Sequence, residues 1–92
     1  MENDFIFMKK ALQLAEKAAS MGEVPIGAVI VGPDNTLLAE GFNQSITNND
    51  PTAHAEVLAI RQAATQLNNY RLSDCTLYVS LEPCAMCMGA IL

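Results

Sequence analysis

Three residues with metal-binding side chains stand at the starts of two predicted helices, and this placement limits how the chain can fold. His54 follows the cap-and-proline signal Asp50-Pro51, and Cys84 follows Pro83 with Cys87 three residues later. An i, i+3 pair places both sulfurs on one helix face. Helical side chains lean toward the N-terminus of their helix, so the two helix starts must lie together if all three residues bind one metal ion.

Hydrophobic spacing predicts three helices and three strands in the order α-β-β-α-β-α. A helix is expected over 4–20, capped by Asn3 or Asp4, with a core-facing stripe of Phe5, Met8, Leu12, Ala15 and Ala19. The apolar run 26–31 predicts a strand covered on both faces, and a turn at 32–35 returns the chain into a second strand over 36–42.

The second half of the chain repeats the alternation of helix and strand. A helix is expected over 53–67, with core positions at Val57, Ile60, Ala64 and Leu67. A strand over 75–80 follows, and a third helix begins at Cys84. Together these elements predict a layered α/β sandwich.

The ligand set indicates a catalytic zinc site. His54, Cys84 and Cys87 supply three ligands and leave the fourth tetrahedral position open. A redox Cys pair is the first alternative, although such pairs normally follow a strand in a βαβ unit. A structural zinc site needs a fourth ligand, for which Cys75 is the spare thiol. Because Cys75 alternates with Leu77 and Val79, we interpret it as a small buried hydrophobic residue.

Glu56 is the candidate general acid–base residue. It stands two positions after His54 among Ala, Val, Leu and Ile residues. Most helix glutamates are solvated surface groups, which is the alternative interpretation. Two positions correspond to about 200° of rotation, so Glu56 would approach the open side of the metal from the other flank. A carboxylate there can accept a proton from an activated water and release it elsewhere.

Composition and chain ends narrow the class of protein. The 92 residues carry a net charge of −5 with only five Lys and Arg, which argues against a dedicated nucleic-acid binder but permits a nucleic acid held at one place. A start without signal-peptide character and the lack of a membrane-length apolar run predict a cytoplasmic protein with no membrane contact. The abrupt end at Ile91-Leu92 predicts that residues 1–92 are an N-terminal fragment of a longer chain. We expect these residues to form one zinc-dependent domain that is inactive or poorly folded without the rest of that chain.

The motif His54-Ala-Glu56 followed by Pro83-Cys84-x-x-Cys87 resembles the signature of the cytidine deaminase-like superfamily. Within it the chain resembles the bacterial tRNA-specific adenosine deaminases, through the segments 23–29, 50–56, 69–72 and 76–84. The resemblance implies a three-layer α-β-α sandwich whose C-terminal strands and helices are missing here.

The chemistry implied by this resemblance is the one established for zinc base deaminases. Zinc on His54, Cys84 and Cys87 would activate water to attack C6 of adenine, giving inosine and ammonia, with Glu56 shuttling protons. The implied substrate is the wobble adenosine of a tRNA anticodon loop, and family members form homodimers. The implied base contacts, each of which has an ordinary structural alternative as a loop cap, core or helix residue, are Asn43, Ile26 and the backbone of Ala55.

Two other functions remain open. A free-base guanine or cytosine deaminase would share the Asp-Pro-Thr-Ala-His-Ala-Glu stretch, although guanine deaminases tend to have Gly-Pro-Phe where this chain has Glu-Val-Pro-Ile. A non-catalytic, zinc-stabilised module would instead use Cys75 as a fourth ligand.

Overall fold

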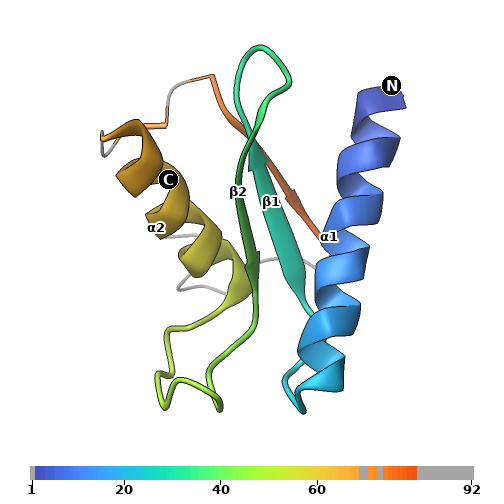
Figure 1. The fold of residues 1–92 in the computed structure, drawn as a ribbon, viewed down its shortest axis with the longest axis vertical. Helices are drawn as coiled ribbons and strands as arrows, with labels where there is room; N and C mark the ends of the chain where they lie inside the picture. The colour runs from blue at the N-terminus through green and yellow to red at the C-terminus, as the bar shows by residue number, and fades with distance from the viewer. Residues whose placement is uncertain (1, 69–70, 73, 81–92) are drawn as a thin grey trace.

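The computed structural model describes residues 2–68, 71–72 and 74–80, which form two helices and three strands (Figure 1). Their bounds are α1 Glu2–Ser20, β1 Gly27–Val31, β2 Leu37–Phe42, α2 Ala55–Leu67 and β3 Thr76–Val79. The predicted order is confirmed as far as the third strand. The helix expected from Cys84 lies outside the described residues.

The sheet forms the middle layer of the fold. Its strand order is β2-β1-β3, and both neighbours run antiparallel to β1. In Figure 1, α1 lies on one side of the sheet and α2 on the other. All five residues of β1 are buried, as expected for a central strand with a helix on each face. The described elements therefore form the predicted three layers.

Small residues let both helices approach the sheet closely. A Cβ added at Gly27 would lie 2.1 Å from the carbonyl oxygen of Ala11 in α1, and one added at Gly41 would lie 2.3 Å from that of Ala55 in α2. On the α2 side the fully enclosed residues are mostly alanines: Ala28, Ala39, Ala55, Ala59 and Ala63, with Ile30. Larger side chains at these positions would force the layers apart.

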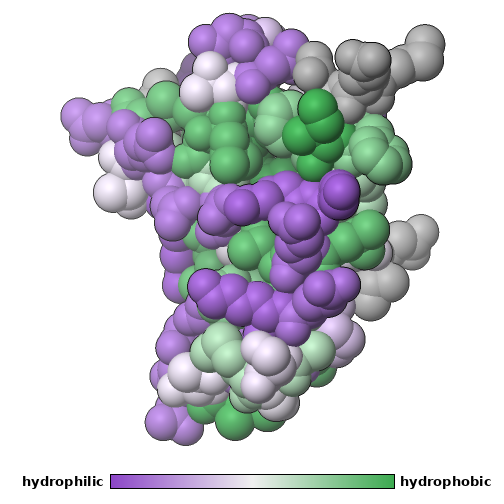
Figure 2. Space-filling view, turned by 45° about the vertical axis from the view of Figure 1, so that its right-hand side comes forward, coloured by the Kyte–Doolittle hydropathy of each residue, from purple (hydrophilic) through white to green (hydrophobic). Residues whose placement is uncertain are grey.

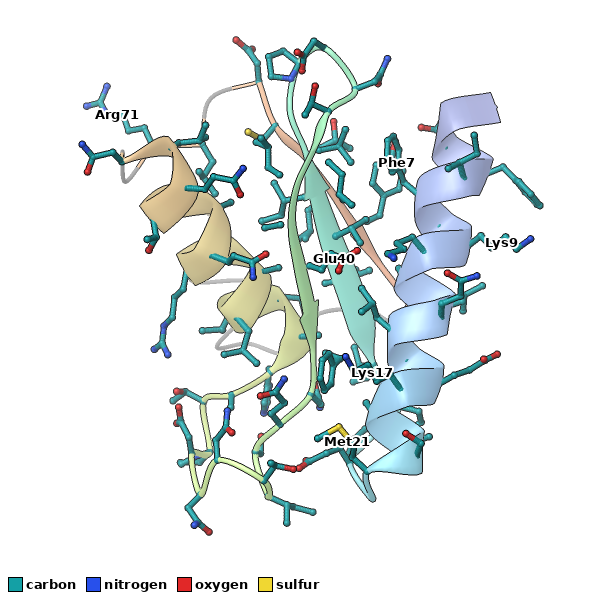
Figure 3. All side chains as sticks on the ribbon, viewed as in Figure 1. Phe7, Lys9, Lys17, Met21, Glu40 and Arg71 are labelled. Atoms are coloured by element: carbon teal, nitrogen blue, oxygen red, sulfur yellow. The ribbon has the colours of Figure 1, made fainter. Side chains whose placement is uncertain are left out.

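The predicted core stripe of α1 was wrong by part of a turn. Phe5 is 72% exposed and Leu12 51% exposed. Ala19 is also exposed and Met8 is half-buried, so of the five predicted stripe positions Ala15 alone is buried. The buried stripe consists of Ala11, Leu14, Ala15 and Ala18. The close contact of Ala11 with Gly27 sets this rotation, and Phe7 points toward the sheet while Lys9 points away (Figure 3).

Two expected helix starts also differ from the structure. Helix α1 already begins at Glu2, so neither Asn3 nor Asp4 is its cap, and Asp4 instead accepts a hydrogen bond from the Tyr78 hydroxyl. Helix α2 begins at Ala55 rather than near residue 53, because residues 50–52 close a turn on the Asp50 side chain. At the other end of α2, Asn68 caps the helix in the left-handed conformation. Of the expected core positions, Leu67 is 43% exposed and Ile60 and Ala64 are half-buried.

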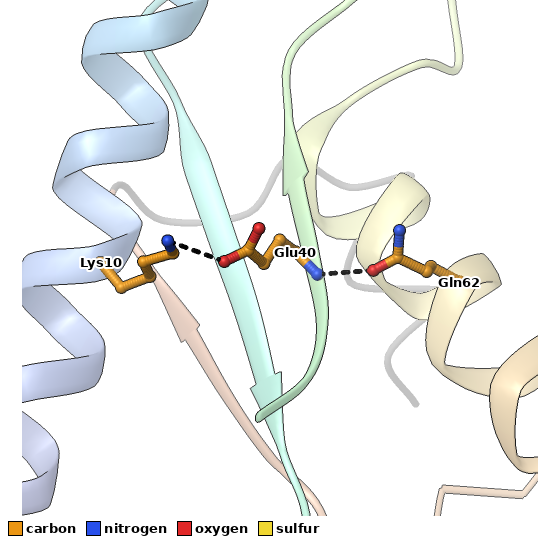
Figure 4. Close-up of polar contacts among 3 residues, drawn as sticks. All are labelled: Lys10, Glu40 and Gln62. Atoms are coloured by element: carbon orange, nitrogen blue, oxygen red, sulfur yellow. Dashed lines mark hydrogen bonds and ion pairs between the residues drawn. The ribbon is translucent and has the colours of Figure 1, made fainter. Parts of the chain in front are cut away.

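Glu40 connects all three layers at the edge strand β2 (Figure 4). Its backbone N–H donates to Gln62 Oε1 of α2 at 2.8 Å, and its carboxylate lies 3.1 Å from Lys10 Nζ of α1. The exposed ion pair contributes at most about 1 kcal/mol. The bond to Gln62 matters more, because it satisfies an N–H that an edge strand would otherwise present to another chain.

The outer surface mixes polar and apolar residues. Phe5, Ile6 and Leu12 of α1 are exposed, and Figure 2 shows hydrophilic residues running between hydrophobic ones across the face turned toward the viewer. Lys17 places its ammonium group 4.9 Å from the ring centroid of Phe42. Within the described part of the chain, neither helix has the length and hydropathy needed to cross a membrane.

Candidate functional site

The N-terminus of α2 is capped from a distant part of the chain. His54 is the N-cap residue by position, with extended backbone angles of φ −86° and ψ 151°. The first helical N–H, that of Ala55, donates to Asn43 Oδ1 at 2.8 Å in a buried contact. Asn43 follows β2 directly, so the sheet and the helix start are held together through this side chain.

Asn43 is therefore both a cap and an oriented amide. It is buried, and its backbone N–H donates to the carbonyl oxygen of Ile26 at 3.1 Å. Because Oδ1 already accepts the Ala55 N–H, the groups that remain for a hydrogen bond to a base are the two N–H donors of Nδ2. The capping alternative raised from the sequence is confirmed, and the base contact stays a prediction. The N–H of Ala55 is also engaged, so the expected backbone contact from this residue stays a prediction too.

Glu56 is buried in the first turn of α2, with 2% of its surface exposed. Among residues 2–68, 71–72 and 74–80, no group forms a hydrogen bond with its Oε1 atom. Burying such an atom without a partner costs about 1–3 kcal/mol, and more for a charged group. The positive end of the helix offsets part of this cost. A buried carboxylate oxygen with no partner beside His54 fits a site that receives a polar ligand, such as a water molecule on a metal ion.

The structure places one of the three predicted zinc ligands. His54 lies at the start of α2, whereas Cys84 and Cys87 lie outside the described residues. Accordingly, no group of three potential metal ligands occurs within the described ranges. One imidazole and two thiolates are donors that zinc accepts, and Glu56 supplies the nearby carboxylate that a catalytic zinc site uses. The donor set therefore fits zinc.

The end of β3 and the start of α2 lie at the same end of the sheet, where β1 begins. The Ser80 hydroxyl accepts a hydrogen bond from the Gly27 N–H at 3.0 Å, and the Ser80 N–H donates to the Gly27 carbonyl at 3.0 Å. Gly27 adjoins Ile26, the residue bonded to Asn43. Ser80, the last described residue before Cys84 in the sequence, therefore lies at the end of the sheet where His54 lies, as the metal hypothesis requires. Ser80 was not identified from the sequence.

Cys75 lies at the opposite end of the sheet. It precedes β3, whose first residue, Thr76, pairs with Val31 at the far end of β1. About 13 Å of extended strand separates Val31 from Gly27. Cys75 packs with Leu77 and Val79 against the α2-side core, as the alternation predicted. Its position favours the core interpretation over a fourth ligand for His54.

Ile26 and Glu23 occupy the segment between α1 and β1. Ile26 is half-buried and packs against the α2-side core, so its predicted role in a base pocket stays a prediction. Glu23 is a buried carboxylate that the sequence reasoning did not assign a role. The hydrogen bond from the Thr47 hydroxyl is the main factor that lowers the pKa of Glu23, and the Thr47 and Ile46 amides lower it further while burial opposes them.

Comparison with known proteins gives consistent results. The sequence profile of the cytidine and deoxycytidylate deaminase zinc-binding region matches residues 1–92. The tRNA-specific adenosine deaminase of Haemophilus influenzae is 54% identical over 91 residues, which is 99% of this chain and 53% of that protein. The guanine deaminase of Bacillus subtilis is 53% identical over 90 residues, covering 97% of this chain and 57% of that protein.

Solved structures share the fold over nearly the whole chain. A structure from a study of A-to-I editing by tRNA:A34 deaminases at the wobble position of transfer RNA has a TM-score of 0.91 at 47% identity, covering 95% of this chain and 66% of that one. The Bacillus subtilis guanine deaminase structure has a TM-score of 0.89 at 54% identity, covering 94% and 55%. The chain spans about half the length of the curated relatives it matches.

Proposed function

The chain belongs to the cytidine and deoxycytidylate deaminase zinc-binding family, and on this premise we propose that the protein converts adenosine to inosine at the wobble position of tRNA. The reaction adds water at C6 of adenine and releases ammonia. The observation that carries the deaminase proposal is the buried Oε1 of Glu56, which has no partner within the described residues and lies two positions after His54.

In the proposed mechanism the protein supplies the metal ligands and the proton transfers. His54, Cys84 and Cys87 would hold zinc, whose chemistry is Lewis-acid activation of water. Glu56 accepts a proton from the attacking water and delivers it to the adenine ring nitrogen. It then takes the proton of the new hydroxyl group on C6 and transfers it to the departing amine, which leaves as ammonia. Its enclosure in the first turn of α2 keeps the carboxylate away from bulk water.

We predict that the two functions of Asn43 can be separated by substitution. Asn43→Asp keeps an oxygen acceptor for the Ala55 N–H but removes the Nδ2 donors, so the free energy of unfolding should stay near wild type while KM for the substrate rises. Asn43→Ala leaves the buried Ala55 N–H without its acceptor and should lower the free energy of unfolding by about 1–3 kcal/mol. Denaturant unfolding and steady-state kinetics measure the two effects.

A matched control for this pair is Asn35→Asp, which makes the same chemical change on an exposed residue of the turn between β1 and β2. It should alter neither KM nor the unfolding free energy appreciably. An unchanged KM in Asn43→Asp would reduce Asn43 to a helix cap.

The RNA substrate is supported by relatives and by the segment before β1. The Haemophilus influenzae relative is a tRNA-specific adenosine deaminase. The residues before β1 are Glu-Val-Pro-Ile, not the Gly-Pro-Phe typical of guanine deaminases. The five Lys and Arg of residues 1–92 can make few phosphate contacts, so we expect this part of the protein to add little to the salt dependence of binding. We also propose that the protein is cytoplasmic and that it forms a homodimer. Sedimentation equilibrium would test the dimer.

The similarity to Bacillus subtilis guanine deaminase favours a second candidate function, the deamination of free guanine. An ammonia-release assay on the full-length protein distinguishes the two. Its substrates are an anticodon stem-loop with adenosine at the wobble position, the same loop without that adenosine, free guanine and free cytosine. We expect ammonia from the adenosine-containing loop alone. Release from guanine without release from that loop would replace the proposal with the second candidate.

A further inference from the structure

Glu23 is a buried carboxylate with hydrogen bonds on both oxygens. It is 6% exposed, which is unusual for a glutamate. Its Oε1 accepts from the Ile46 N–H at 3.1 Å, and its Oε2 accepts from the Thr47 N–H and the Thr47 hydroxyl, each at 2.6 Å. Its own backbone N–H closes α1 by donating to Ala18 O at 3.0 Å. One residue therefore joins the end of α1 to a loop more than twenty positions later.

The loop held by Glu23 carries the candidate base contact at one end and leads to the candidate metal ligand at the other. Residues 43–50, here called the 43–50 loop, begin at Asn43 and precede the short turn that ends at His54. Gln44 N–H donates to Ala53 O at 2.9 Å, so the two ends of this connection lie side by side. The bonds from Glu23 fix its middle, while the Asn43–Ile26 bond fixes its start.

We propose that Glu23 is a positioning residue that holds the 43–50 loop in place, so that Asn43 meets the target base already oriented. This inference rests on the proposed deaminase function. Glu23 does not touch the reacting atoms in this scheme; it acts through the loop that carries Asn43. Such preorganisation matters because substrate binding weakens in proportion as fewer molecules hold the loop in the binding-competent conformation.

A carboxylate suits this position better than an amide. Three donors converge on Glu23, and an ionised carboxylate accepts all of them. Glutamine would present one oxygen and one NH2 group, which would face an N–H donor. The lowered pKa of Glu23 is consistent with a carboxylate that stays ionised at neutral pH. Glu23→Gln is therefore a nearly isosteric change that removes part of the hydrogen bonding.

The test measures the loop and the kinetics separately in full-length, zinc-loaded protein. In Glu23→Gln, amide hydrogen exchange at Ile46 and Thr47 should accelerate while zinc content stays at the wild-type level. Substrate binding must then order the loop, so KM should rise by about tenfold or more while kcat per bound zinc is retained. A purely structural role would lower the folded, zinc-loaded fraction without changing KM of the remainder.

Two further variants keep the proposal falsifiable. Thr47→Val removes the hydroxyl donor and should shift KM in the same direction by a smaller factor, and the double variant should fall short of the product of the two effects because they share one contact. Glu16→Gln is the matched control on the exposed face of α1 and should change nothing.

The outcomes also separate this inference from the proposed function. Unchanged exchange at Ile46 and Thr47, or faster exchange with an unchanged KM, overturns the positioning role. If wild-type protein deaminates free guanine and not the anticodon loop, the tRNA proposal fails. The same KM comparison is then made with guanine, where a rise still supports the positioning role and an unchanged KM overturns it.

Discussion

Replacing Glu56 by Gln is expected to lower kcat by about 10²–10⁴-fold, the range that a positioned general acid–base group contributes. Glutamine occupies nearly the same volume but cannot accept and return a proton. Because Glu56 is not one of the proposed zinc ligands, His54, Cys84 and Cys87, zinc content should remain at one ion per chain. Ammonia release under single-turnover conditions and elemental analysis for zinc measure these two quantities.

The thermal stability of Glu56→Gln provides a second test of the role of Glu56. The carboxylate is 2% exposed, and within the described residues its Oε1 atom has no hydrogen-bond partner. Removing its charge should therefore leave the zinc-free protein at least as stable as wild type, because function rather than folding accounts for a buried charge of this kind. Thermal unfolding in the presence of a chelator measures this difference.

The control for Glu56→Gln is Glu40→Gln. It makes the same chemical change on the exposed side chain of β2 and leaves the backbone bond to Gln62 in place. It should preserve turnover. If Glu56→Gln turned over at the rate of Glu40→Gln, the proton-transfer role would be wrong and the buried carboxylate would need another explanation.

The sequence was most informative where one residue and its immediate neighbours determine the structure. The unbroken apolar run before Gly32 predicted a strand covered on both faces, and β1 is buried throughout. Glu56 stood out as a lone carboxylate in an apolar helix, and it is buried. The interpretation of Cys75 as a hydrophobic residue followed from its alternation with Leu77 and Val79, and all three are half-buried and pack against the core.

Predictions failed where the deciding partner lies far away in the chain. Local capping rules placed the start of α2 near residue 53, but the cap of this helix is Asn43, twelve residues before Ala55. The buried stripe of α1 follows from the close approach of Gly27, which periodicity within the helix does not encode. Glu23 was assigned no role because its partners, Ile46 and Thr47, follow more than twenty positions later.

Gly41→Ala is expected to disrupt both folding and the site. The new Cβ would lie 2.3 Å from Ala55 O and 2.9 Å from the Ala59 N atom. Both contacts are with helix backbone, so no side-chain rotation relieves them, and α2 would have to withdraw by at least 0.7 Å for the first contact to reach 3.0 Å. Overpacking of this kind lowers the free energy of unfolding by about 3 kcal/mol, the upper part of its usual range. Denaturant unfolding of zinc-loaded protein measures the loss.

The same displacement should weaken zinc binding and turnover in the molecules that remain folded. The residue contacted is Ala55, which lies between His54 and Glu56. The clash therefore moves the start of α2 away from the end of the sheet where Ser80 is bound to Gly27. Competition with a chromophoric chelator measures zinc affinity per folded molecule. Gly32→Ala is the matched control, since its nearest neighbours are side-chain atoms at 3.4 Å, and it should retain both stability and zinc affinity. If Gly41→Ala lost stability but kept wild-type zinc affinity, the metal site would not depend on how closely α2 packs against β2.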